Sequence, residues 1–238
     1  MFRLTRLIPA LLLALTVAAC GPTVLAPTPE PDQPVAAPTV AAPADTSLPT
    51  GIHTYVIVPE ETTASYSVDE EFFGGALGKY GIPSGKQDTI GRTNAVTGQF
   101  QLNWDDLTSP LGDNSFTVDL STLTSEQSLR DGWIRDNGPK FGEFPEAVFV
   151  AESLANAPTS YTLGDEVSFD LVGQLTIRGI TQPATFAVTT TFQGDAITGV
   201  AIAALKMTDF GITPPDFANT LTVKDDFEAK LEFTAREQ

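Results

Sequence analysis

Residues 166–178 read EVSFDLVGQLTIR, and along this stretch apolar and polar side chains alternate. The apolar members occupy the odd positions Val167, Phe169, Leu171, Leu175 and Ile177. Successive side chains of a β-strand point to opposite faces, so this spacing gives the stretch one apolar and one polar face. It therefore predicts a long strand that packs one side against an apolar interior, as strands of antiparallel sheets do.

The same period of two recurs along the chain from residue 54 onward. Alternation predicts strands at 54–58, 64–72, 100–104, 116–120, 147–154, 184–192, 196–207 and 227–233. Turn dipeptides such as Gly164-Asp165 and Gly194-Asp195 separate them. About eight or nine antiparallel strands must protect their edges, which a sandwich or a closed barrel achieves. The long strands near 166–177 and 196–207 favour the barrel.

Two segments interrupt the strand pattern. Leu129, Trp133 and Ile134 lie at helical spacing behind Thr124 and Gln127, which predicts one short helix with a capping box, ended by Gly138-Pro139. The stretch from 72 to 93 is rich in glycine and is predicted to loop across one end of the domain. Its composition also suggests the hypothesis that residues 74–91 gate an interior cavity.

Charge and composition exclude several functions. The chain of 238 residues carries a formal charge of −17, which repels nucleic acid and disfavours a ligand held by a charged head. A single cysteine and a single histidine, His53, leave no residues for a Cys/His metal site and little for histidine catalysis. We therefore expect a protein that is not an enzyme and has no metal or cofactor.

The N-terminus predicts export and lipid anchoring. Residues 1–19 combine a basic start, an apolar core of 7–17 and small residues before Cys20, the pattern of a bacterial lipoprotein signal peptide. Lipidation of Cys20 would anchor the protein in a membrane. We expect it in the cell envelope, facing the periplasm or the cell exterior. An ordinary secretory peptide with an incidental cysteine is the alternative.

Residues 20–50 are predicted to be a linker without a packed core. Eight of the chain's 18 prolines fall there, among alanine and threonine and without lysine or arginine. Such a segment favours extended conformations and could span up to about 90 Å at 3.1 Å per residue. The third part, residues 51–238, is expected to form a single β domain.

Several motifs of this domain resemble the YceI-like family in the family's own order. They lie at 96–100, 120–123, 129–131, 141–145, 148–149, 173–183 and 209–212. Together they cover roughly residues 52–236. The resemblance implies a lipocalin-like antiparallel β-barrel that holds a long-chain lipid, polyisoprenoid or isoprenoid-quinone-like, in an internal cavity. The chain departs from the family at 66–71, which lacks a common histidine, and at Met207, where an arginine is common.

The apolar faces of the strands, together with the resemblance, predict the residues of that cavity. They are Tyr66, Phe100, Leu102, Phe116, Val118, Trp133, Phe141, Phe149, Phe169, Leu171, Leu175, Ile177, Phe186 and Phe210. Each buried methylene contributes roughly 0.8 kcal/mol, so one isoprene unit contributes about 3–4 kcal/mol before ordering costs. A lipid tail therefore needs no charged contact.

Periodicity alone also allows a dry interior. The same aromatic residues could fill the solid core of a β-sandwich, and the protein would then be an adhesion or assembly module of the cell envelope. That alternative predicts no sizeable cavity and a large exposed apolar patch.

Overall fold

A computed structural model describes residues 48–74, 78, 81–82, 84–108, 112, 114–218 and 220–238. The predicted signal peptide, Cys20 and most of the linker lie outside the described residues. The strands are β1 (Ile52–Ile57), β2 (Thr63–Phe72), β3 (Gly85–Thr93), β4 (Val96–Asn103), β5 (Ser115–Asp119), β6 (Glu146–Ala155), β7 (Glu166–Ile177), β8 (Ile180–Gln193), β9 (Ala196–Lys206), β10 (Asp216–Phe217) and β11 (Leu221–Glu237). The helices are α1 (Ser128–Asp136) and the 3-10 turns η1 (Pro59–Glu61), η3 (Leu120–Thr122) and η4 (Thr208–Phe210).

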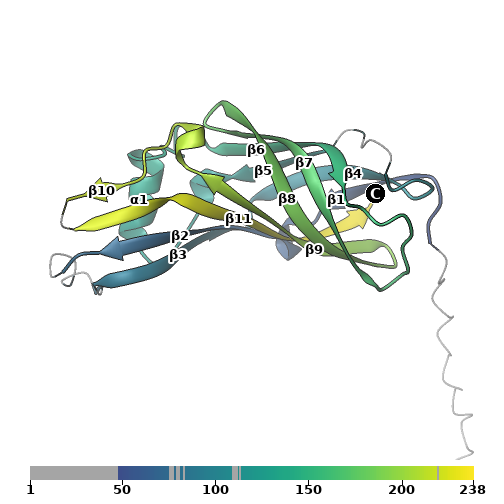
Figure 1. Cartoon of the computed structure of the whole chain (residues 1–238), viewed down its shortest axis with the longest axis horizontal. Helices are drawn as coiled ribbons and strands as arrows, with labels where there is room; N and C mark the ends of the chain where they lie inside the picture. The colour runs from purple at the N-terminus through teal and green to yellow at the C-terminus, as the bar shows by residue number, and fades with distance from the viewer. Residues whose placement is uncertain are drawn as a thin grey trace, which may run out of the picture. The chain divides into compact units, whose positions relative to one another are not determined.

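These strands form a closed antiparallel β-barrel of eight strands, which confirms the predicted fold class. The order runs β1-β4-β5-β6-β7-β8-β9-β11, and β11 pairs back to β1 through Ile57 and Ala235. Figure 1 shows the strands wrapping around one axis, with α1 and β10 near one end. Every strand expected from the alternation overlaps an observed strand.

Two of the eight positions in the barrel wall are each occupied by two shorter strands placed end to end. β1 and β2 lie one after the other along β11, and their partners β4 and β3 follow in the same way. η1 separates β1 from β2 because Pro59 has no N–H to donate to a ladder and begins a turn instead. The result is one long, interrupted hairpin that extends beyond the closed part of the barrel.

The strand β3 corrects the prediction that residues 72–93 form an irregular loop. β3 pairs with β2 over its whole length, from Phe72 with Gly85 to Ala64 with Thr93. Buried and exposed residues alternate along β3, but the buried ones include the polar Thr89 and Thr93, and the glycines interrupt the pattern further. The strand therefore has no apolar face that periodicity could reveal. The segment proposed as a gate, 74–91, is therefore strand from Gly85 onward, and part of the remainder lies outside the described residues.

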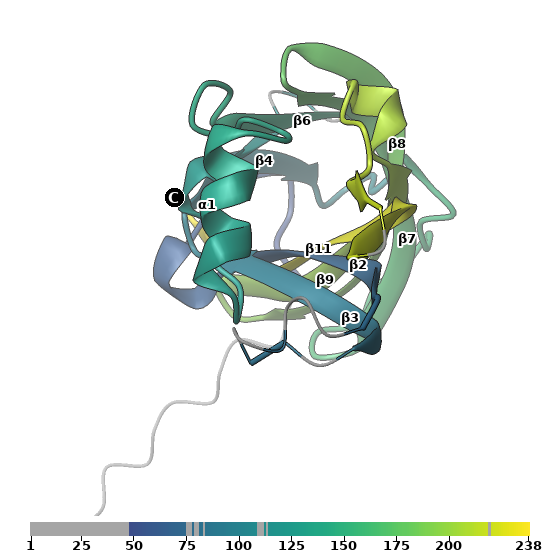
Figure 2. The same ribbon diagram turned by 90° about the vertical axis from the view of Figure 1, so that its left-hand side faces the viewer.

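Helix α1 completes the barrel wall beyond β3. The chain leading into α1 forms an isolated bridge between Arg92 and Thr124, and the helix then stands across the end of the barrel between β6 and the β2–β3 hairpin (Figure 2). The predicted capping box is wrong, since Gln127 is the N-cap and offers no side-chain cap. Asp131 closes the first turn instead, because its carboxylate accepts from the backbone N–H and hydroxyl of Ser125 at 3.0 and 2.6 Å.

Candidate ligand-binding cavity

The apolar faces of the strands surround one internal cavity. All but one of the predicted pocket residues line it: Tyr66, Phe100, Leu102, Phe116, Val118, Trp133, Phe141, Phe149, Phe169, Leu171, Leu175, Ile177 and Phe186. Its volume is about 520 Å³. That size lies within the range of about 300–1,000 Å³ typical of small-molecule pockets.

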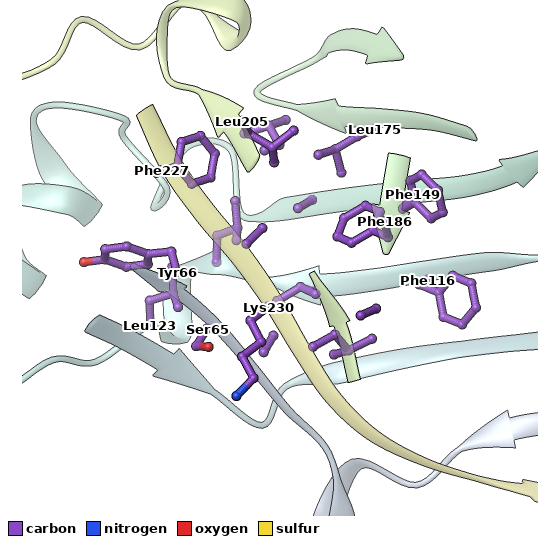
Figure 3. A pocket seen from close by; sticks show the side chains of 18 of the residues that line it. Ser65, Tyr66, Phe116, Leu123, Phe149, Leu175, Phe186, Leu205, Phe227 and Lys230 are labelled. Atoms are coloured by element: carbon purple, nitrogen blue, oxygen red, sulfur yellow. The ribbon is translucent and has the colours of Figure 1, made fainter. Parts of the chain in front are cut away.

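The barrel interior is hollow rather than filled. Phe116, Phe186 and Phe227 face inward from different walls, as Figure 3 shows, yet each keeps part of its surface accessible. In a close-packed core such rings would be covered on all sides by partner atoms. Their residual exposure is therefore exposure to the cavity, which excludes the solid-core sandwich.

Phe210 is the predicted pocket residue that does not line the cavity. It is 1% exposed, at the end of η4, and belongs to a packed cluster with Phe141, Ile177 and Ile212. The left-handed Gly211 follows it and turns the chain, so that Phe210 packs within the wall. Its role is structural.

One end of the cavity is closed by aromatic rings. Tyr55 is fully buried and stacks on Phe100, with ring centroids 5.5 Å apart. The ring centroids of Trp104 and Phe192 are 4.7 Å apart. The indole N–H of Trp104 donates to Tyr55 Oη at 3.0 Å. Burial raises the pKa of Tyr55 to about 12, although the Trp104 hydrogen bond opposes the shift, so its hydroxyl stays neutral at physiological pH. We call these residues, together with Tyr161, the aromatic floor.

The opposite end carries the exposed residues of the cavity lining. Leu129 on α1 is 60% exposed and Phe217 on β10 is 45% exposed. Trp133 of α1 contacts the ring of Phe217 edge to face, with centroids 5.9 Å apart, so α1 and β10 meet across this end. Because solvent reaches lining residues here, we place the mouth of the cavity between α1, β10 and Ile82.

A buried ion pair lies just inside the mouth. Arg130 of α1 donates from Nε and Nη2 to the two oxygens of Glu70 on β2, at 3.2 and 2.8 Å. The side chains are only 13% and 5% exposed, and both line the cavity. Arg130 Nη1 also donates to Glu126 Oε1 at 2.7 Å and to Ser125 Oγ at 3.1 Å. The two bonds to Glu70 fasten α1 to β2, and the two others hold the segment that leads into the helix.

This pairing keeps the guanidinium charged. Burial alone would lower the pKa of Arg130, but its hydrogen bonds to Glu70 and Glu126 outweigh burial and raise it above the ordinary value. The pKa of Glu126 is lowered, because the Arg130 hydrogen bond overcomes the opposing effect of burial. Arg130 and Asp131 thus make structural contacts, and Glu70 is buried in an ion pair.

Two lining residues carry a buried polar atom without a hydrogen-bond partner in the described chain. They are the hydroxyl of Tyr66 and the side-chain nitrogen of Asn114. The ring of Tyr66 lies over Gly91 of β3, where an added Cβ would stand 2.2 Å from Cε1, so only glycine leaves room for it. Burial raises the pKa of Tyr66 well above its usual range, despite the opposing charge of Arg130, and keeps the hydroxyl neutral.

Sequence reasoning missed the polar members of the lining and several small apolar ones. Ala201 and Ala229 face the cavity where a bulky residue would fill it. Asn114 gave no signal, and Glu70 was overlooked because it stands among other polar residues in the sequence. For Glu70 a usable signal was its even position, shared with Tyr66 and Val68 on the inward face of one strand.

Neither a metal site nor a membrane-spanning helix is found in the part of the chain that the structure describes. No group of three or more His, Cys, Asp or Glu side chains there could hold a metal ion. No described helix is long and apolar enough to cross a membrane.

A closed antiparallel barrel around a long apolar cavity defines a lipocalin-like class of protein. The sequence profile of the YceI-like domain matches residues 55–235. The chain belongs to the YceI-like family, as its motifs suggested.

Solved structures agree with this assignment at the level of the fold. The chain is similar to BcnA of Burkholderia cenocepacia, with a TM-score of 0.54 and 16% identity over 75% of this chain and 98% of that one. It is also similar to a polyisoprenoid binding domain from Saccharophagus degradans implicated in plant cell wall breakdown, with a TM-score of 0.55 and 10% identity over 77% and 98%. No curated protein sequence matches the chain.

Proposed function

We propose that this protein is a non-catalytic lipoprotein that carries or sequesters a long-chain apolar lipid in its barrel. The observation that carries the proposal is the hollow of about 520 Å³ lined by inward rings and aliphatic side chains. The Saccharophagus degradans relative, described as polyisoprenoid binding, suggests the isoprenoid class of tail, including quinone-like lipids. The family assignment supports binding rather than catalysis.

The cavity suits a flexible hydrocarbon chain for a physical reason. Its walls provide dispersion contacts and no water-binding groups along most of their length, so the transfer of each methylene from water is favourable by roughly 0.8 kcal/mol. The aromatic floor stops the tail at one end, and the mouth between α1 and β10 admits it at the other. A tail of several isoprene units would gain enough binding energy without a charged contact.

The proposed test compares the lipid content of three purified proteins. Full-length protein isolated from its native membrane is extracted with organic solvent, and the extract is identified by mass spectrometry. Wild-type protein is expected to release a long-chain isoprenoid lipid in near-stoichiometric amount. Ala229→Trp, which fills the cavity beside Tyr66, is expected to reduce that amount at least tenfold.

The matched control is Ala204→Trp. Ala204 lies on β9, which pairs with β11, and faces outward, so this variant adds the same ring to the outer surface. It is expected to keep the wild-type lipid content. Wild-type protein that emerges free of lipid, while folded and monodisperse, would contradict the carrier function.

The tether is a separate part of the proposal and rests on the sequence before residue 48. Lipidation of Cys20, followed by the proline-rich linker, would hold the barrel in the cell envelope at a distance of up to about 90 Å from the membrane. Cys20→Ser is expected to move the protein from the membrane fraction to the soluble fraction and to abolish incorporation of labelled fatty acid. A Cys20→Ser protein that stays in the membrane fraction would refute lipid anchoring at this residue.

A further inference from the structure

The cavity lining contains no cation that is available to a ligand, within the part of the chain that the structure describes. Its two basic side chains are Arg130 and Lys230. Glu70 and Glu126 both accept from Arg130, and Glu232 accepts from Lys230 Nζ at 2.8 Å. Lys230 also lies on the outward register of β11, between Ala229 and Leu231, so its charge is not directed into the hollow.

Around Arg130 the negative charges outnumber the positive ones. Glu70 and Glu126 contact the guanidinium directly, and Asp131 is buried one residue further along α1. The charge of Arg92 also helps to lower the pKa of Glu126, so the group holds two positive against three negative formal charges. The carboxylates and Ser125 occupy most of the hydrogen-bonding capacity of the guanidinium.

An anionic head group would meet two penalties at this position. It would lose its hydration on entering a cavity with apolar walls, and no uncompensated cation would replace that hydration. It would also be repelled by the excess of carboxylates at a short range and low effective dielectric. A phosphate or diphosphate head therefore finds nothing at the mouth that would retain it.

An uncharged oxygen meets neither penalty. The hydroxyl of Tyr66 lies within electrostatic range of Arg130 and Glu70, is neutral, and has no partner in the described chain. An alcohol, phenol or carbonyl oxygen that reached it would supply the missing hydrogen bond, and the removal of an unsatisfied buried polar group is favourable. The surroundings of Arg130 and Tyr66 thus match a neutral polar head on an apolar tail.

We propose that the cavity selects lipids with an uncharged head and rejects phosphorylated ones. Glu70 is the specificity-determining residue, because it neutralises Arg130 in place. This inference rests on the proposed lipid-binding function and adds the chemical class of the head group to it. Two sources share the favoured chemistry, namely isoprenoid alcohols and isoprenoid quinones, and both have uncharged oxygens.

The test uses two probes with the same tail and different head charge. Full-chain protein in phosphatidylcholine nanodiscs is equilibrated with equimolar geranylgeraniol and geranylgeranyl monophosphate, and the bound lipid is measured by native mass spectrometry. Empty nanodiscs correct for partition. We expect at least a tenfold preference for the alcohol, and a short-chain ubiquinone in place of the alcohol distinguishes the two neutral sources.

A double variant tests the role assigned to Glu70. Glu70→Gln with Glu126→Gln leaves the guanidinium of Arg130 in the lining without a carboxylate in contact with it. We expect phosphate occupancy to rise at least about tenfold, while alcohol occupancy stays within twofold. The matched control, Glu61→Gln with Glu143→Gln, removes the same charge from exposed pairs with Arg236 and Lys140 and should change neither probe.

The outcomes separate this inference from the proposed function. If both probes bind and the phosphate binds as well as the alcohol, the inference is overturned and lipid binding stands. If neither probe binds, the proposed function fails, and this inference fails with it. An equal gain in both double variants would assign the effect to overall charge and remove Glu70 from the account.

If the double variant does not fold, the single variant Glu126→Gln tests the role of Glu70 instead. Glu126 is 55% exposed, so Glu126→Gln removes a carboxylate without opening the buried pair. It is expected to raise phosphate occupancy no more than about twofold, because Glu70 still neutralises Arg130. A tenfold rise from Glu126→Gln alone would show that Glu70 is not the determinant.

Discussion

The two ends of the barrel use the same kinds of residue for different purposes. At the aromatic floor Tyr55 is 0% exposed, and its ring is enclosed by Phe100, Trp104 and Phe192. Toward the mouth, rings such as Phe227 also face inward but border empty space. The difference teaches that inward orientation and burial are separate properties in this barrel. Packing at the floor stabilises the fold, and the absence of packing beyond it leaves room for a ligand.

The largest expected effect compares the loss of a ring at each end. Tyr55→Ala removes a fully packed side chain and the partner of Trp104, and should lower the free energy of unfolding by about 4 kcal/mol. Phe227→Ala removes a ring that lacks neighbours on one side, and should cost about 1–2 kcal/mol. Urea denaturation measures both values. Equal losses would mean that the mouth end is packed as densely as the floor.

A second prediction concerns the ion pair at the mouth. Arg130→Met leaves Glu70 buried without its partner and should lower the free energy of unfolding by about 3 kcal/mol. Adding Glu70→Leu to that variant should restore most of the loss, since the uncompensated charge is gone. Arg236→Met breaks an exposed pair with Glu61 and is the control, with a much smaller expected loss because solvent screens that pair. An Arg130→Met protein as stable as the control would contradict a structural role for the pair.

The smallest expected effect lies at the outer edge of the floor end. His53 Nδ1 lies 2.7 Å from Glu237 Oε1, and its pKa is raised chiefly by the backbone carbonyl of Thr50 and then by Glu237. Because the folded pKa is the higher one, this stabilisation is full below the ordinary pKa of 6.5 and is lost as pH rises through the folded value. His53→Gln should therefore lower stability by less than about 1 kcal/mol at pH 5.5 and not at all at pH 9.

Thermal unfolding of wild type and His53→Gln at these two values of pH checks the sign. A gap in Tm that widens with rising pH would show that the neutral imidazole, and not the cation, is the stabilising form.

The fold could be predicted because alternation is a local property. Phe169, Leu171 and Leu175 reveal the inward face of β7 without knowledge of any other strand, and the motif at 173–183 adds the family. The strand β3 escaped detection because Gly85 and Gly91 interrupt its pattern. Position 91 requires glycine because the ring of Tyr66, on the neighbouring strand, occupies the space that a side chain would need.

The chemistry at the mouth could not be predicted in the same way. Glu70 and Arg130 are 60 residues apart in sequence, and their pairing depends on where α1 lies relative to β2. The position of Phe210 likewise depends on a turn at Gly211 that moves it from the lining into the wall. Periodicity indicates which side of a strand faces inward. It does not indicate the distance to the opposite wall, and so it does not distinguish a hollow from a core.

The most direct test of the hollow is an experimental electron-density map of the protein purified from its native membrane. We expect continuous tubular density inside the barrel, beginning near Trp104 at the floor and ending near Arg130 at the mouth, surrounded by the inward rings of Phe116, Phe186 and Phe227. Side chains from opposite walls in direct contact along that path, with no space for a hydrocarbon chain, would contradict it.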